Sequence, residues 1–315
     1  MRVTLLVAMT LVAIAGCGDD AAVVPEAPVP PAYLGQWGSP GSGPGEFRQP
    51  SEITIGPRGS VWVLDHQNAR LQQFDPDGTY LREWGGEIEA GIFFTPLINA
   101  FAIHGDRVYV SDILVSRTYV LTLEGQLLDV WDYFAVHGGL AVEADGTVLL
   151  SGFRVIDRGP PVRIEGPYLW RLGPEGQKRS SQDLDLRAIA LDRDGFVHGI
   201  TTRVVNGLPR AAVVKVSPEG DILRRWETGE ESTVFDDLAV DGAGNVYVAN
   251  RPNQSIYKFS RFGHSGSGPG FLVGWNTTDP EGRPFSWPAG IAIDDHNRIY
   301  VSDFDQDRVV RFDSR

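Results

Sequence analysis

The sequence predicts an all-β fold, on three observations. First, the chain of 315 residues contains 37 glycines and 21 prolines, which is typical of a chain that turns often. Second, no stretch after residue 17 keeps the apolar period of 3.6 residues that an amphipathic helix would show. Third, a segment of short strands and turns recurs every 40 to 53 residues. One small sheet cannot bury both of its faces, so such repeats stack radially and the predicted architecture is a β-propeller.

Six copies of the repeat follow one another along the chain. The segment Pro50 to Asp65 reappears as Pro288 to Asp303, and weaker copies cover residues 101–112, 140–151, 189–200 and 238–250. The aliphatic residue that opens the second strand marks each copy, at Val61, Val108, Val148, Val197, Val246 and Ile299. The sequence therefore predicts one domain, residues 32–315, of six four-stranded blades.

The first copy predicts the order of strands within a blade. Residues 53–55 form a short inner strand, 61–64 the second strand, 70–74 the third and 80–84 the fourth. The turn Asp75-Pro-Asp-Gly78 separates the last two, and its glycine accepts a positive φ without steric cost. The tryptophans at fourth-strand ends are expected to pack against the adjacent blade; they are Trp37, Trp84, Trp131, Trp226 and Trp275.

The two ends of the domain are expected to meet in one blade. The sixth copy reaches only its third strand, residues 308–313, whereas Tyr33 to Trp37 resembles a fourth strand without a blade of its own. Adding this N-terminal strand to the last blade would close the ring and remove an exposed sheet edge.

The repeat resembles the NHL repeat of six-bladed β-propellers. The shared pattern begins with a proline and two further residues, followed by a strand of the Ile-Ala-Ile-Asp type and a turn that contains Gly or Asn. A Val-Tyr-Val strand comes next, and then Asp and Arg. Copies 1, 5 and 6 match best, whereas Gly152 and Gly199 stand near the usual Asp in copies 3 and 4. It also implies salt bridges within a blade, Asp65 with Arg70 and Asp303 with Arg308. It specifies the fold and leaves the function open, because propellers serve both as binding modules and as enzymes.

Composition narrows the choice of partners. Twenty-eight basic against 41 acidic residues give a net charge of −13, which would repel a phosphate backbone and argues against nucleic acid. The single cysteine excludes an intrachain disulfide and a zinc cluster built on cysteines. We expect a monomer.

The N-terminal segment predicts export and anchoring. A basic start at Arg2 and an apolar stretch over residues 3–15 lead directly to Ile14-Ala-Gly-Cys17, which resembles a bacterial lipobox. Residues 1–16 are then a signal peptide, Cys17 the lipidated residue, and residues 17–31 a Pro-rich tether. The protein would be a lipoprotein of the bacterial cell envelope, facing the periplasm or the exterior. The alternative is an ordinary secretory signal with an incidental cysteine.

Polar residues at the entrance to the inner strands form the candidate binding site. They are Glu52, Asn99, His137, Arg187, Asp236 and Asp237. Carboxylates with an amide suit Ca²⁺, whereas His137 with carboxylates suits Zn²⁺ or general base catalysis. Glu52 and Asp237 are the metal candidates. In the structural alternative, these groups pair with one another around a water-filled channel.

Long connections are expected to overhang this site. Loops beyond about 12 residues in a compact domain are usually functional. The candidates are residues 85–99, 151–168, 201–212 and 275–288.

Two classes of function follow. The first is a lipid-anchored recognition module for a protein, peptide or glycan. The second is a metal-dependent enzyme, either a lactonase-like hydrolase or a lyase. The resemblance to gluconolactonase-like propellers implies a divalent metal held by Glu, Asn, Asn and Asp. Glu52 and Asp237 match the carboxylates, but Arg187 stands near an amide position. Peptide-amidating lyases need several zinc histidines, and only His137 is well placed. We therefore expect binding, and we assign no catalytic residue.

Overall fold

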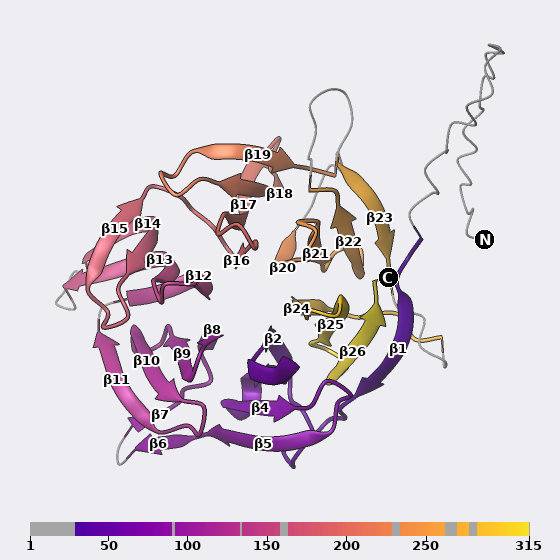
Figure 1. Ribbon diagram of the computed structural model, residues 1–315, viewed down its shortest axis with the longest axis horizontal. Helices are drawn as coiled ribbons and strands as arrows, with labels where there is room; N and C mark the ends of the chain where they lie inside the picture. The colour runs from indigo at the N-terminus through magenta and orange to yellow at the C-terminus, as the bar shows by residue number, and fades with distance from the viewer. Residues whose placement is uncertain are drawn as a thin grey trace, which may run out of the picture.

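The computed structural model describes residues 29–89, 92–132, 134–157, 163–228, 234–261, 270–276 and 282–314. Six four-stranded antiparallel sheets form a ring around a central channel (Figure 1). The predicted six-bladed β-propeller is confirmed. Helical structure in these ranges is limited to two single turns, Pro57–Gly59 and His66–Asn68. None of the helices in these ranges has the length and apolar character needed to cross a bilayer.

The first three blades follow in chain order, from the inner strand outward. Blade 1 consists of β2 (Pro50–Ile55), β3 (Val61–Asp65), β4 (Arg70–Phe74) and β5 (Tyr80–Gly85). Blade 2 consists of β8 (Ile98–His104), β9 (Arg107–Asp112), β10 (Arg117–Thr122) and β11 (Leu127–Asp132). Blade 3 consists of β12 (Phe134–Val142), β13 (Val148–Asp157), β14 (Arg163–Leu172) and β15 (Lys178–Gln182).

Blades 4 to 6 complete the ring. Blade 4 consists of β16 (Ile189–Leu191), β17 (Val197–Val205), β18 (Leu208–Val216) and β19 (Ile222–Trp226). Blade 5 consists of β20 (Phe235–Val240), β21 (Val246–Asn250), β22 (Ser255–Phe259) and β23 (Phe271–Trp275). Blade 6 consists of β24 (Pro288–Ile293), β25 (Arg298–Asp303), β26 (Arg308–Asp313) and β1 (Ala32–Trp37).

The N-terminal strand β1 pairs antiparallel with β26, from Ala32 opposite Asp313 to Trp37 opposite Val309. The ring of Trp37 lies 5.7 Å from that of Phe74 in blade 1. The first described strand therefore occupies the outer edge of blade 6 and contacts the next blade.

Fourth-strand tryptophans fix the spacing between blades. The indole N–H of Trp84 donates to the carbonyl of Leu123, 3.3 Å away in the next blade. The ring packs on Gly125, whose φ is +85° and where an added Cβ would lie 2.9 Å from the indole. Turn glycines thus serve both the backbone conformation and the close approach of the neighbouring blade.

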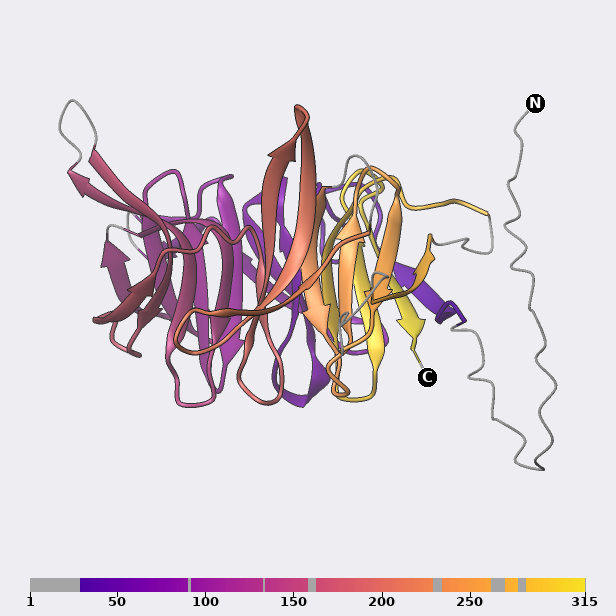
Figure 2. The ribbon, with the colours of Figure 1, turned by 90° about the horizontal axis from the view of Figure 1, so that it is seen from above.

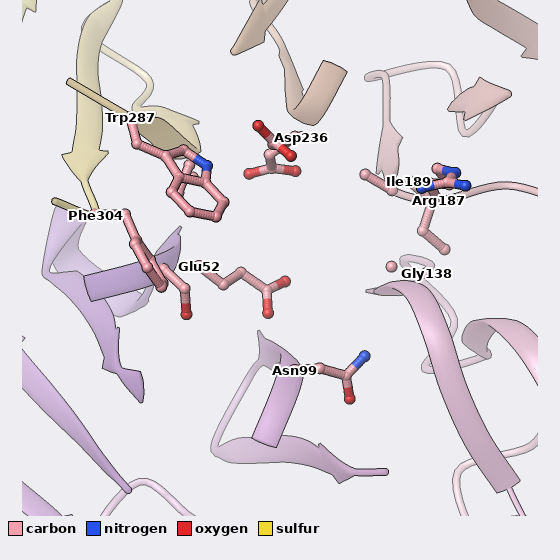
Figure 3. A pocket seen from close by; sticks show the side chains of 14 residues that line it. Glu52, Asn99, Gly138, Arg187, Ile189, Asp236, Trp287 and Phe304 are labelled. Carbon is pink, nitrogen blue, oxygen red and sulfur yellow. The ribbon is translucent and has the colours of Figure 1, made fainter. Parts of the chain in front are cut away.

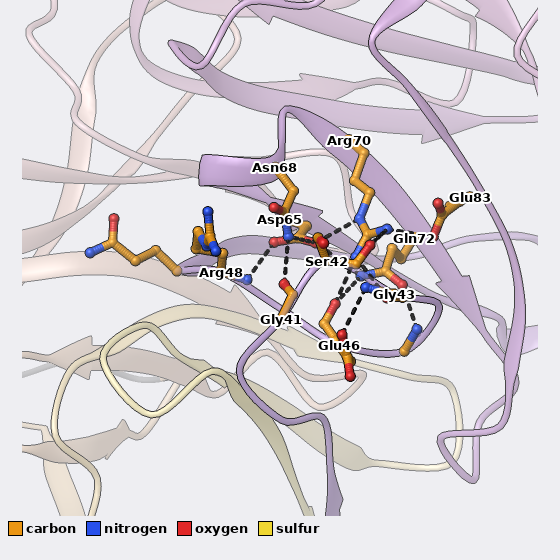
Figure 4. Close-up of polar contacts among 12 residues, drawn as sticks. Gly41, Ser42, Gly43, Glu46, Arg48, Asp65, Asn68, Arg70, Gln72 and Glu83 are labelled. Atoms are coloured by element: carbon orange, nitrogen blue, oxygen red, sulfur yellow. Dashed lines mark hydrogen bonds and ion pairs between the residues drawn. The ribbon is translucent and has the colours of Figure 1, made fainter.

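Buried ion pairs hold the ends of the second strands. Arg70 Nε lies 2.7 Å from Asp65 Oδ2, and Arg308 lies 3.1 Å from Asp303. In blade 1 the same guanidinium donates to the carbonyls of Ser42, Gly43 and Glu46 (Figure 4). The Gly-rich segment 41–45 is therefore a loop bound by Arg70.

Two connections predicted as loops are instead extensions of strands. In blade 4, β17 and β18 run on to a turn at Asn206-Gly207, with φ of 52° and 80°, and Val205 pairs with Leu208. In blade 3, β13 and β14 are ten residues long. Both hairpins extend beyond the neighbouring strands on the same side of the ring (Figure 2). Residues 85–99 also contain a small hairpin, β6 (Glu87–Glu89) with β7 (Ile92–Phe93).

Candidate functional site

A break in strand register shapes the mouth of the channel. In β2, β20 and β24 the regular pairing is interrupted between the first residue and the fourth. The two residues in the interruption are Ser51 and Glu52 in blade 1, and Asp236 and Asp237 in blade 5. Bulges of this kind turn side chains away from the regular alternation of a strand. Every such pair lies at the end of the channel from which the two long hairpins project.

One pocket of about 200 Å³ joins these positions across the ring (Figure 3). It brings together five of the six residues predicted from the sequence: Glu52, Asn99, Arg187, Asp236 and Asp237. The side chain of the sixth, His137, lies outside the described residues, although the adjacent Gly138 and Gly139 line the pocket. Trp287 and Phe304 complete one wall.

Glu52 and Asp237 each bind the backbone of the next blade. Glu52 Oε2 accepts a hydrogen bond from the N–H of Phe101 at 2.7 Å. Asp237 Oδ2 accepts a hydrogen bond from the N–H of Ile291 at 2.9 Å. Its Oδ1 accepts one from the N–H of Leu238 at 2.8 Å. The two carboxyl groups therefore join blade 1 to blade 2 and blade 5 to blade 6.

Burial also raises the pKa of both carboxyl groups. Burial raises the pKa of Glu52 well above its usual range, the charge of Asp237 raises it further, and the Phe101 hydrogen bond lowers it. Burial raises the pKa of Asp237 to about 7, while the N–H groups of Ile291 and Leu238 lower it. At neutral pH the base of the pocket therefore carries less negative charge than its composition suggests.

Asp236 lies nearer the opening, between charged and aromatic neighbours. Its Oδ2 is 3.5 Å from Arg251 Nε. Burial raises the pKa of Asp236 to about 6, whereas Arg251, the Trp287 indole N–H and Arg187 lower it. Arg187 itself is exposed at the rim. Acidic side chains therefore line the bottom of the pocket, and basic side chains stand at its edge.

The aromatic wall was not predicted from the sequence. The rings of Trp287 and Phe304 have centroids 4.4 Å apart, and the guanidinium carbon of Arg251 lies 4.4 Å from the centroid of the Trp287 ring. Trp287 directly precedes the first residue of the sixth repeat segment, and Phe304 directly follows its last residue, Asp303. Reading those flanking positions would have identified both residues.

The donor set of the pocket bears on the predicted metal site. Among the residues that the structure describes, no group of three or more His, Cys, Asp and Glu side chains is arranged to hold a metal ion. The carboxylates of Glu52 and Asp237 already accept backbone N–H groups, and Arg187 adds positive charge at the mouth. A Ca²⁺ or Zn²⁺ site built on Glu52 and Asp237 stays a prediction.

Comparisons with known proteins agree with the fold. The model of the NHL repeat matches residues 285–312. NHL repeat-containing protein 3 of Mus musculus is 36% identical over 89 residues, which cover 27% of this chain and 24% of that protein. The chain therefore aligns with only about a quarter of this relative.

Solved structures resemble the whole ring. A gluconolactonase from Xanthomonas campestris superposes with a TM-score of 0.58 at 15% identity, covering 84% of this chain and 86% of that one. A streptogramin B lyase superposes with a TM-score of 0.57 at 10% identity, covering 84% and 93%. At such identities the likeness establishes the fold alone. The chain is a six-bladed β-propeller whose last blade matches the NHL repeat.

Proposed function

We propose that this chain is a lipid-anchored, extracytoplasmic recognition module that binds a protein or peptide ligand at the mouth of its channel. The observation that carries the proposal is the convergence of Glu52, Asp236 and Asp237 beside the Trp287 ring in one pocket. Carboxyl groups next to an aromatic face suit a ligand cation, which gains both ion pairing and attraction to the ring.

The composition of the pocket favours a peptide over a neutral glycan. A basic side chain of the ligand would enter toward the carboxyl groups, and Arg187 and Arg251 at the edge would meet a carboxylate or a backbone carbonyl. A volume of about 200 Å³ suits one side chain rather than a whole small molecule. The hairpins of blades 3 and 4 project on this side and would add contacts along the ligand.

We assign no catalytic residue. The described part of the pocket contains no histidine, lysine or cysteine, so acid–base chemistry there would fall to Asp236 and Asp237, whose pKa values are about 6 and about 7. The similarity to a lactonase and a lyase concerns the fold, so it assigns no reaction to this chain.

The binding test uses fluorescent peptides that differ only at one central residue: Lys, Arg, norleucine or Glu. We expect the Lys and Arg peptides to bind at least about tenfold more tightly than norleucine, equivalent to about 1.4 kcal/mol. Asp236→Asn and Trp287→Ala should remove this preference. Asp295→Asn is the matched control, because that side chain is 96% exposed and lies outside the pocket. Equal affinity for all four peptides would reject the proposal.

The anchor is tested separately. Cys17 lies outside the described residues, and its role rests on the sequence motif alone. Cys17→Ser should move the protein from the membrane fraction to the soluble fraction of a bacterial host. Fractionation with membranes unchanged would contradict lipidation at this residue.

A further inference from the structure

The long hairpin of blade 4 leaves a strand edge uncovered beside the channel mouth. Its inner neighbour β16 has only three residues, which pair with residues 197–199 of β17. The N–H of Arg187 donates to the carbonyl of Ile200 at 2.7 Å, and the N–H of Ile200 donates to that of Ala188 at 3.0 Å. Past this point β17 runs on to Val205 above the ring (Figure 2), and within the described ranges no strand pairs with it on the inner side.

The alternation of the strand shows which main-chain groups lie at this edge. In an antiparallel strand, successive residues direct their N–H and C=O groups to opposite sides. The register between β17 and β18 is regular throughout, so Thr202 and Val204 direct these groups inward as Ile200 does. The side chain of Val204 is 74% exposed. Two N–H and two C=O groups are therefore available to pair with another strand.

Blade 3 has a similar long hairpin, but its inner edge is covered. Its inner strand β12 is nine residues long and pairs with β13 as far as Phe134 opposite Arg154. Aligning the repeat markers Val148 and Val197 places residues 152–154 of β13 level with 201–203 of β17. The end of β12 thus occupies the place in blade 3 that a further strand would take in blade 4.

The outer edge of the blade 4 hairpin is protected, whereas the inner edge is not. Pro209 of β18 lies directly opposite Val204, so its main-chain groups point outward as those of Val204 point inward. Proline has no N–H to donate, and it is one of the residues that prevent pairing at a sheet edge. The inner edge carries Thr202 and Val204, both β-branched residues that favour strands. The hairpin therefore favours the addition of a strand on its inner side.

A groove of about 500 Å³ joins this edge to the pocket at the channel mouth. The groove shares Arg187 and Asp236 with that pocket, and Phe153 of blade 3 and Val234 before blade 5 also line it. Arg187 is the residue whose N–H binds the carbonyl of Ile200, two residues before Thr202. Apolar side chains from the two neighbouring blades suit an extended segment, whose alternate side chains point to opposite faces.

We propose that the peptide ligand leaves the mouth pocket as an extended strand and pairs with the inner edge of β17 at Thr202 and Val204. This proposal rests on the proposed function, because it assigns a conformation to the same peptide. The pocket selects the basic side chain, and the main-chain hydrogen bonds add affinity for any neighbouring sequence that adopts a strand. The residues beside the basic one are expected to be β-branched or aromatic.

The first test changes the main chain of the ligand. The probe is a fluorescent peptide in which Thr and Val alternate, with one central Lys in place of a Thr. One variant is N-methylated on every Val and the other on every Thr, so each loses the N–H groups of one side of the strand. We expect one variant to bind at least about fivefold more weakly than the other, in line with the loss of hydrogen bonds. Equal affinities would overturn the proposal.

The second test changes the edge in the protein. Val204→Pro removes an inward N–H and leaves the bonds between β17 and β18 in place. We expect it to weaken binding of the unmethylated peptide at least about fivefold. Val204→Ala is the matched control, because it shortens the same side chain, keeps the N–H and should bind like the wild type. Equal losses in the two variants would assign the effect to the side chain and overturn the pairing.

The outcomes distinguish this proposal from the proposed function. If Lys is still preferred over norleucine while both methylated peptides bind equally, the pocket stands and the strand is rejected. If the preference for Lys is absent, the proposed function is rejected and the strand with it. A dimer in sedimentation that Val204→Pro dissociates would place a second copy of this chain on the edge, and this too would overturn the proposal.

Discussion

The protonated state of Asp237 predicts an unusual dependence of stability on pH. Its pKa is 3.8 in the absence of the fold and about 7 within it, because burial disfavours the charged form. Between those values the folded state holds a proton that the unfolded state has lost. Stability therefore falls as the pH rises through this interval, and it levels off above the folded pKa. Each pH unit within the interval removes about 1.4 kcal/mol, so the loss from about pH 5 to about pH 8 is about 2 to 3 kcal/mol.

The assay is urea unfolding followed by tryptophan fluorescence at several pH values. In Asp237→Asn a neutral amide replaces the protonated carboxyl group. This variant should therefore lack the part of the stability loss with rising pH that comes from ionisation of Asp237. Removing the charge also lowers the pKa of Glu52, which reduces the loss further. Asp295→Asn, at a side chain 96% exposed, should follow the wild type at every pH. If Asp237→Asn and the wild type lose stability in parallel, Asp237 does not hold the proton.

Three further predictions concern the fold. Asp65→Asn should lower the free energy of unfolding by about 1 to 3 kcal/mol in urea titrations, because buried Arg70 loses its 2.7 Å partner and keeps only the carboxylate of Glu83, 2.8 Å away; a loss below about 0.5 kcal/mol would contradict this. Deleting residues 32–37 should lower the melting temperature sharply, because it exposes the edge of β26; an unchanged melting curve would refute the role of β1 in closing the ring. Gly125→Ala should destabilise by about 1 to 3 kcal/mol more than Gly105→Ala in thermal melts, since both have positive φ but only Gly125 faces a neighbouring tryptophan. Equal effects would assign the whole loss to the backbone.

The blades could be predicted from the sequence because nearby residues mark where each strand begins and ends. The strands predicted at 61–64 and 70–74 correspond to β3 and β4 to within one residue, since turn glycines and apolar runs delimit them. The sequence also contains a signal for the hairpin of blade 4. This signal is Asn206-Gly207, a pair whose two positive φ angles suit a tight hairpin turn. Treating residues 201–212 as a loop was wrong because the strands continue past the edge of the blade.

The pocket could be predicted only in part, because it depends on where the register breaks. Sequence position predicted that Glu52 and Asp237 face the channel mouth. It did not show that both carboxyl groups bind the backbone of the next blade, since that contact is set by the distance between sheets. Trp287 and Phe304 flank Pro288 and Asp303, which pair between β24 and β25, so the pairing of these two strands within blade 6 brings the two rings together.

The acids at the mouth give a last prediction for the proposed ligand. Joining one blade to the next does not require a charge, because serine hydroxyls do it elsewhere: Ser302 Oγ donates to the carbonyl of Ser51, and Ser151 Oγ donates to that of Leu186. Glu52 and Asp237 make contacts of the opposite polarity, because each accepts a backbone N–H group, and burial raises both pKa values. A ligand cation that enters the pocket would replace the held protons and allow the carboxyl groups to ionise, so binding of the cation should release protons near neutral pH.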